Sequence, residues 1–275
     1  MTGDIKQDEY DSFRLFLEQS AGITLGDNKQ YLVNSRLNRL MGEKGISSLG
    51  DLVDKLKKGA IPGLRETIID AMTTNETLWF RDSSPFNVMK EEILPSLGAS
   101  LSRNIRIWSA ACSSGQEPYS LSMLVDEFKQ EKPGKLKSEV EITATDISPT
   151  VLKAAKEAKY DGLSMARGLS DERKSRFFTQ VEKCWEVKPE IRKRVTFREL
   201  NLLDSFSALG KFDIIFCRNV LIYFSSELKR DIISRMSKQL NPGGLLILGS
   251  SESLTGHSDE FELVRSPICV HYRLK

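Results

Sequence analysis

Apolar residues recur at helical spacing through the first third of the chain. Two series with a period near 3.6 residues lie within 10–17 and 31–44. A third helix is expected over 49–58, because Ser48 can cap its start and Gly59 can end it. A fourth is expected to follow Pro62-Gly63. The pattern predicts an all-helical domain over residues 1–83, ended by the turn Asp82-Ser83-Ser84-Pro85.

From residue 86 onward, short apolar runs alternate with amphipathic segments. The expected strands are 105–109, 141–145, 195–199, 212–217, 245–249, 261–264 and 268–273, with helices at 119–128, 149–158 and 226–239. This alternation is typical of an α/β domain with a doubly wound, mostly parallel sheet, here over 84–275. Only a tight turn at Ser266-Pro267 separates the last two strands, so the sheet should end in an antiparallel hairpin.

Residues of about 160–198 interrupt the alternation. They are expected to form a small β insertion, with a helix over 170–178 and a strand pair within 179–188.

Composition narrows the class of protein. The 275 residues carry a net charge of only +2, which calls for no polyanionic partner, and 40% of them are hydrophobic. The first eleven residues are polar and acidic, unlike a signal peptide, and no apolar run approaches the roughly 18 residues of a membrane span. The four cysteines are far apart and form no CxxC pair, so we expect reduced thiols, a cytoplasmic protein and no metal site.

A loop of small residues follows the first strand of the α/β region. Ser109–Gly115 separates this strand from a helix, and small side chains there let a ligand approach the backbone and the helix N-terminus. The loop contains one glycine and no lysine, so it lacks both the dinucleotide fingerprint and the P-loop pattern. A nucleoside without phosphates is therefore the better candidate, and S-adenosylmethionine fits.

Two carboxylates flank this loop. Asp146 ends the second strand, where it could accept hydrogen bonds from ribose hydroxyls or merely cap the next helix. Glu117 could bind the ammonium group of an amino-acid tail, or it could be an ordinary acidic residue in the first helical turn.

Two further polar clusters lie at predicted boundaries. NETLWFR (75–81) offers an arginine that could hold a carboxylate, although its aromatics could simply fill the domain interface. FDIIFCRNVLIYF (212–224) places Arg218-Asn219 at the carboxyl edge of a strand. The tyrosine of this segment, Tyr223, could equally be a core residue.

Several of these segments together resemble one known family. Residues 74–81, WSAACSSGQEP (108–118), 143–147, 200–203 and FCRNVLIYF (216–224) are similar to the bacterial chemotaxis receptor methyltransferases, the CheR family. The resemblance spans nearly the whole chain. It implies transfer of a methyl group from S-adenosylmethionine to glutamate side chains on the cytoplasmic helices of chemoreceptors. The products would be S-adenosylhomocysteine and the methyl esters used in sensory adaptation.

The resemblance also implies roles for individual residues. The cofactor contacts that it implies are Asn75, Thr77, Arg81, Glu117, Asp146, Asn201, Leu202, Arg218 and Asn219. Arg81 and Tyr223 match residues placed beside the reacting carboxylate. Because the sulfonium methyl is already activated and glutamate is ionised at pH 7, no general base is needed. We therefore expect Arg81 to orient the cofactor or substrate carboxylate and Tyr223 to set the angle of attack.

Substrate recognition is expected to be electrostatic. Between Asp27 and Arg65 there are eight basic and four acidic residues, and Arg36 and Arg39 share one helix face that could meet receptor glutamates. An ordinary solvated face is the alternative, and a nucleic-acid site is less well supported because the patch lacks interleaved aromatics.

The insertion departs from the family pattern. Family members that bind a receptor tail peptide carry a glycine-rich turn there, whereas residues 178–187 contain no glycine. We therefore expect this protein to find receptors without that tether. A nicotinamide dehydrogenase and a cofactor-binding signalling module without turnover are the rival interpretations.

Overall fold

The N-terminal part of the molecule is a bundle of short helices. The computed structural model describes residues 5–100 and 102–275. It contains α1 (Gln7–Ala21), α2 (Gln30–Glu43), α3 (Leu49–Lys58) and α4 (Leu64–Met72). Their apolar stripes meet in one core that includes Tyr10, Phe13 and Leu37. Ser48 accepts a hydrogen bond from the Asp51 N–H and Gly59 adopts a left-handed conformation, as the sequence predicts.

The helical pattern ends at Met72 and does not continue to residue 83. Residues 73–83 form an extended linker with turns, because Trp79 and Phe80 are buried in the core of the α/β domain and not in the helical bundle. Tertiary packing therefore overrides the local pattern here. Residues 1–4 of the expected helical segment lie outside the described residues.

A mostly parallel sheet forms the centre of the second domain, as predicted. Its strands, within the described residues, are β1 (Ile105–Ala110), β2 (Val140–Asp146), β6 (Val195–Glu199), β7 (Phe212–Cys217), β8 (Leu240–Leu248), β9 (Phe261–Arg265) and β10 (Val270–Leu274), in the order β6-β2-β1-β7-β8-β10-β9. The five neighbouring strands β6, β2, β1, β7 and β8 all run parallel to one another. β10 runs antiparallel to both of its neighbours, which confirms the C-terminal hairpin.

Helices cover both faces of this sheet. The helical segments α5 (Ser84–Val88), η1 (Met89–Ile93), α6 (Leu94–Ser100), α7 (Gln116–Glu131) and α8 (Pro149–Glu157) lie on one face. α12 (Ser226–Ser237) packs on the other face, against alternate residues of the same strands. β8 begins at Leu240, earlier than expected, because Pro242-Gly243-Gly244 forms an irregularity within the strand and not a turn before it.

The inserted segment folds as a small subdomain. It comprises β3 (Lys159–Tyr160), α9 (Gly162–Met165), α10 (Asp171–Phe177), β4 (Phe178–Val181), β5 (Cys184–Val187) and α11 (Pro189–Arg192). Its strands form an antiparallel sheet in the order β3-β5-β4, with β4 at an edge. β6 follows immediately and belongs to the main sheet, although the predicted insertion extended to residue 198.

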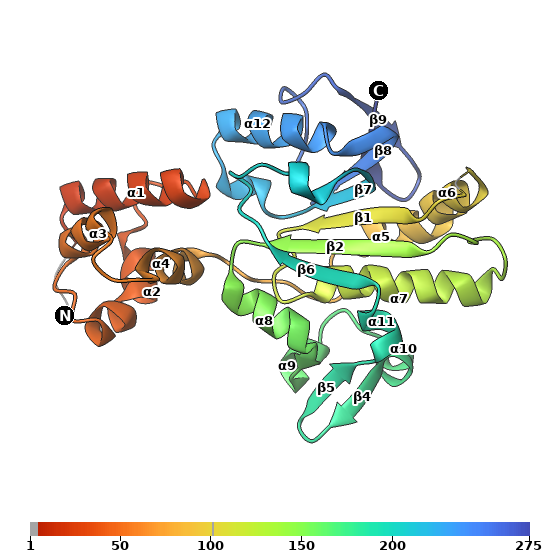
Figure 1. Ribbon diagram of the computed structural model, residues 1–275, viewed down its shortest axis with the longest axis horizontal. Helices are drawn as coiled ribbons and strands as arrows, with labels where there is room; N and C mark the ends of the chain where they lie inside the picture. The colour runs from red at the N-terminus through yellow and green to blue at the C-terminus, as the bar shows by residue number, and fades with distance from the viewer. Residues whose placement is uncertain (1–4, 101) are drawn as a thin grey trace.

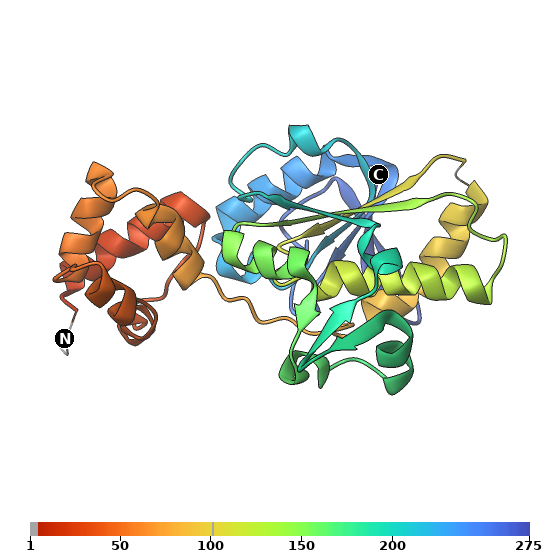
Figure 2. The same cartoon turned by 60° about the horizontal axis from the view of Figure 1, so that its bottom comes forward.

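The two domains are joined by the extended linker. Figures 1 and 2 show the bundle of α1–α4 beside one end of the α/β domain, with the β4–β5 subdomain projecting from the latter. No helix in the described part of the chain is long and apolar enough to cross a membrane.

Candidate functional site

A pocket lies where the helical bundle and linker meet the carboxyl ends of parallel strands. Residues that follow β1, β2, β6 and β7 line it, as do residues of α1, α2 and the linker. The connections from β1 and β7 lead to opposite faces of the sheet, so this edge is a topological switch point, where open α/β sheets bind ligands. All but one of the predicted site residues line this pocket: Arg36, Asn75, Thr77, Arg81, Glu117, Asp146, Asn201, Leu202, Arg218, Asn219 and Tyr223.

Asp146 is buried at the end of β2. Its Oδ2 accepts a hydrogen bond from the Ser113 N–H (2.8 Å), and its Oδ1 accepts one from the Ser148 N–H (3.0 Å). Burial raises the pKa of the Asp146 carboxyl above its ordinary value, although these backbone donors act in the opposite direction. The helix cap at this point is Ser148, which accepts from the Val151 N–H. Asp146 is therefore not needed as the cap of α8.

Glu117 lies in the first turn of α7 and belongs to an ion network that joins the buried Arg218 to the exposed Asp82. Its Oε1 accepts a hydrogen bond from Ser109 Oγ (2.7 Å), and its Oε2 contacts Arg218 Nη1 (2.9 Å). Arg218 Nη2 also donates to Asp82 Oδ2 (2.9 Å) and to the Arg81 carbonyl. Two carboxylates share one guanidinium here, so the cluster retains a formal charge of −1 and favours a cation.

The linker carries three of the predicted residues across the pocket. The Asn75 carbonyl accepts a hydrogen bond from Ser113 Oγ (2.8 Å), which joins the linker to the loop after β1. Arg81 Nη1 donates to the Glu76 carbonyl, and Thr77 is half-buried. Phe80 and Asp82, on either side of Arg81, both have positive φ angles, of 48° and 60°.

A tight turn after β7 presents Asn219 and Tyr223. Asn219 has a φ of 58°, and the Glu252 carboxylate accepts hydrogen bonds from the N–H groups of residues 219, 220, 221 and 249. Glu252 was not predicted. Its position after a buried strand, within the polar run Ser250–Ser253 at the carboxyl edge of the sheet, was the available signal.

The helical bundle closes the pocket through direct contacts. The Thr24 N–H donates to the Tyr223 carbonyl (2.9 Å), and Asn201 Nδ2 donates to the Ser20 carbonyl (2.8 Å). Ser148 Oγ also donates to Asp70. The side-chain amide of Asn201 therefore has a structural partner in addition to its place in the pocket.

The two arginines of α2 have different surroundings. Arg36 lines the pocket, and its guanidinium donates to the carbonyls of Met72 and Thr73 at the end of α4. Arg39 does not line the pocket. Its side chain is 91% exposed and pairs with Glu43 within the same helix.

Comparisons of the sequence with family models and with known proteins agree on one family. The family described as "CheR methyltransferase, SAM binding domain" matches residues 75–270, and "CheR methyltransferase, all-alpha domain" matches residues 8–73. The chain is 56% identical over 269 residues to "Chemotaxis protein methyltransferase 1" of Pseudomonas aeruginosa, covering 97% of this chain and 98% of the relative. It is 52% identical over 272 residues to the protein of that name from Vibrio cholerae, covering 98% of each. A "Chemotaxis protein methyltransferase" of Borreliella burgdorferi is 33% identical over 262 residues, covering 93% and 92%.

Proposed function

This chain belongs to the CheR family of S-adenosylmethionine-dependent methyltransferases, which methylate chemoreceptors, and we propose that the pocket described above is where its reaction takes place. The observation that carries this assignment is the convergence of eleven residues, from six separate parts of the sequence, on one pocket at the switch point of the sheet.

The residues of the pocket fit S-adenosylmethionine. Each oxygen of Asp146 accepts one backbone N–H, and a carboxylate has about four lone-pair sites, so about two remain for the ribose hydroxyls. Glu117 belongs to a cluster with one uncompensated negative charge, which matches the ammonium group of the amino-acid tail. The loop after β1 is built of small residues, which allow the ligand to approach closely.

When bound, S-adenosylmethionine supplies a methyl group that is already activated by its sulfonium charge. The chain must therefore align an ionised glutamate and exclude water. Arg81 offers a guanidinium at the pocket, and Tyr223 offers a hydroxyl without a partner among the described residues. In this proposal Arg81 orients a carboxylate and Tyr223 fixes the angle of attack.

Calorimetric titration with S-adenosylmethionine and S-adenosylhomocysteine tests the cofactor site. We expect binding by the wild type and its loss in Asp146→Ala. Methyl transfer to a purified receptor fragment then tests the reaction, with Arg81→Ala and Tyr223→Phe expected to lose at least tenfold in kcat. Full turnover by both variants would contradict their assigned roles.

The substrate in this proposal is the helical cytoplasmic region of a chemoreceptor, which places the enzyme in the cytoplasm. Arg39, on the exposed surface of α2, is the better candidate for contact with receptor glutamates. Arg36 is held by the end of α4, so its substitution should lower stability as well as binding. The absence of a glycine fingerprint and the C-terminal hairpin disfavour a nicotinamide dehydrogenase, and the presence of Arg81 and Tyr223 disfavours a signalling module without turnover.

We also propose that no receptor tail peptide tethers this enzyme. The turn between β4 and β5 is short, and Glu182 occupies its left-handed position without a glycine. Titration of a labelled receptor tail peptide should show no binding at micromolar concentration, and micromolar affinity would overturn this part of the proposal.

A further inference from the structure

The linker is strained on both sides of Arg81. Phe80 and Asp82 are not glycines, yet both have φ angles in the left-handed region, at 48° and 60°. Such conformations cost on the order of 1–3 kcal/mol each and persist only where surrounding contacts hold them. The contacts that hold Phe80 therefore also fix the position of the neighbouring Arg81 backbone, from which the Arg81 side chain extends.

Phe80 is held from several directions. Its N–H donates to Ser120 Oγ (3.1 Å), and its ring packs edge-on against Phe86, with the centroids 5.3 Å apart. The guanidinium of Arg173, from α10 of the inserted subdomain, lies 3.7 Å from the centroid of the same ring. This distance is well within the range of a cation–π contact.

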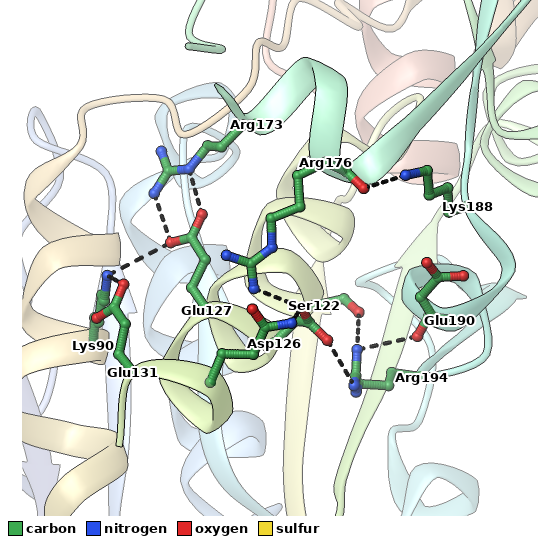
Figure 3. Close-up of polar contacts among 11 residues, drawn as sticks. Lys90, Ser122, Asp126, Glu127, Glu131, Arg173, Arg176, Lys188, Glu190 and Arg194 are labelled. Carbon is green, nitrogen blue, oxygen red and sulfur yellow. Dashed lines mark hydrogen bonds and ion pairs between the residues drawn. The ribbon is translucent and has the colours of Figure 1, made fainter. Parts of the chain in front are cut away.

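Arg173 is itself fixed on the α/β domain. Its Nε and Nη2 donate to the two oxygens of Glu127 on α7, at 2.7 and 2.9 Å, as Figure 3 shows. The side chain of Glu127 is only 8% exposed, and Lys90 Nζ lies 3.7 Å from its Oε2. A bidentate ion pair of this kind fixes the plane of the guanidinium. A lysine ammonium cannot form the same bidentate contact.

The subdomain also holds the residue before Phe80. Trp79 Nε1 donates to the Ser164 carbonyl (3.0 Å), and its ring packs edge-on against Tyr160 and Phe178. A Cβ atom at Gly168 would collide with the Trp79 carbonyl oxygen, so only glycine allows this approach.

From this geometry we infer that Arg173 is a positioning residue for methyl transfer. Stacked on Phe80 and fixed by Glu127, it holds the strained linker so that Arg81 projects into the pocket. The inserted subdomain thus contributes to the site without lining it. The inference rests on the role of Arg81 in the proposed function.

The chain offers a matched control on the same helix. Arg176 also joins α10 to α7, through Asp126 at 2.8 Å, and its side chain is 28% exposed, as is that of Arg173. Its guanidinium lies over Phe177 of the subdomain and not over the linker. Loss of Arg176 therefore removes a comparable ion pair without touching Phe80.

The experiment compares Arg173→Ala, Arg173→Lys and Arg176→Ala by melting temperature and by kcat/KM for S-adenosylmethionine with a receptor fragment. We expect about a tenfold loss for Arg173→Ala, less than about a twofold loss for Arg176→Ala, and only partial recovery in Arg173→Lys. In an Arg81→Ala background, Arg173→Ala should cost less than about twofold, because the two residues act in series. Equal losses for Arg173→Ala and Arg176→Ala, or an undiminished loss in that background, would overturn the inference.

Hydrogen exchange of the linker provides a readout that does not depend on turnover. Amides of residues 78–83 should exchange faster in Arg173→Ala than in Arg176→Ala or the wild type. Unchanged exchange would overturn the inference even with an active enzyme. A wild type that binds no cofactor would instead refute the proposed function, while the exchange comparison would still report on the contact between Arg173 and Phe80.

Discussion

At the scale of single residues, the pocket contains one buried carboxylate that is held by backbone donors, that of Asp146. Asp146 receives one N–H on each oxygen and is 6% exposed, so its position is set before any ligand arrives. Pre-organisation of this kind lowers the cost of binding, since no side chain has to be ordered at that moment. The same burial raises the pKa of the carboxyl, which makes its acceptor capacity sensitive to acid.

Substitution Asp146→Asn should weaken cofactor binding and alter its pH dependence. In the proposed mode of binding, the wild-type carboxylate accepts hydrogen bonds from both ribose hydroxyls at pH 7, so its loss should raise the Kd for S-adenosylmethionine roughly 10- to 100-fold. As the pH falls towards the raised pKa, the wild-type carboxyl gains a proton, and the affinity of the protein for S-adenosylmethionine declines. This decline should begin at a higher pH than it would for an aspartate with an ordinary pKa. Calorimetry at successively lower pH, starting from pH 7, should show a declining affinity for the wild type and a flat profile for Asp146→Asn. Parallel profiles would contradict this assignment.

At the scale of elements, the turn after β7 is organised by one side chain from the loop after β8. Glu252 accepts N–H groups from three successive residues of the turn, 219–221, and thereby stabilises the left-handed conformation of Asn219. The position of Tyr223, two residues later, follows from this turn. Neighbouring parallel strands end side by side, so their loops can support one another.

Substitution Glu252→Gln should disturb this turn. The amide places an NH₂ group where backbone N–H groups converge, so we expect a loss of about 1–3 kcal/mol in the free energy of unfolding. A lower kcat should accompany it, because Tyr223 is no longer held in place. Urea unfolding and receptor methylation measure the two effects. Glu262→Gln, on the exposed strand β9, is the control and should behave like the wild type.

At the scale of the whole molecule, the pocket exists only where the two domains meet. Gly22, at the end of α1, has a φ of 73°, and a Cβ there would lie 2.5 Å from Leu228 Cδ2 and 3.1 Å from Phe224 Cδ1. The Thr24 N–H, two residues on, donates to the Tyr223 carbonyl. Close approach at Gly22 therefore allows the bundle to seat beside Tyr223.

Substitution Gly22→Ala should separate the domains at this contact. Gly45 also has a positive φ, of 63°, but a Cβ at that position would meet no atom within 4 Å among the described residues, so Gly45→Ala reproduces the backbone strain alone. Backbone strain should cost each variant about 1–2 kcal/mol in the free energy of unfolding, and the steric clash should add to this loss in Gly22→Ala. Only Gly22→Ala should also lose cofactor affinity, by about tenfold in calorimetry. Equal affinities for the two variants would show that this contact does not shape the pocket.

The sequence by itself determined most of the elements, the class of sheet and most of the predicted residues that line the pocket. Periodicity and end signals are local, so the helix over 49–58 and the strands over 195–199 and 212–217 could be predicted from the residues that form them. The small-residue loop and Asp146 could be predicted because parallel strands place their carboxyl ends at one edge. Resemblance to the family supplied the remaining candidates.

Only the tertiary structure decided the contacts between distant segments. It assigned residues 73–83 to an extended linker, because Trp79 and Phe80 are buried against the α/β domain. It showed that Arg36 lines the pocket and Arg39 does not. It also placed Glu252 against the turn at 219–221 and Arg173 against Phe80. These contacts join residues tens of positions apart, and no local pattern encodes them, because they depend on how finished elements pack.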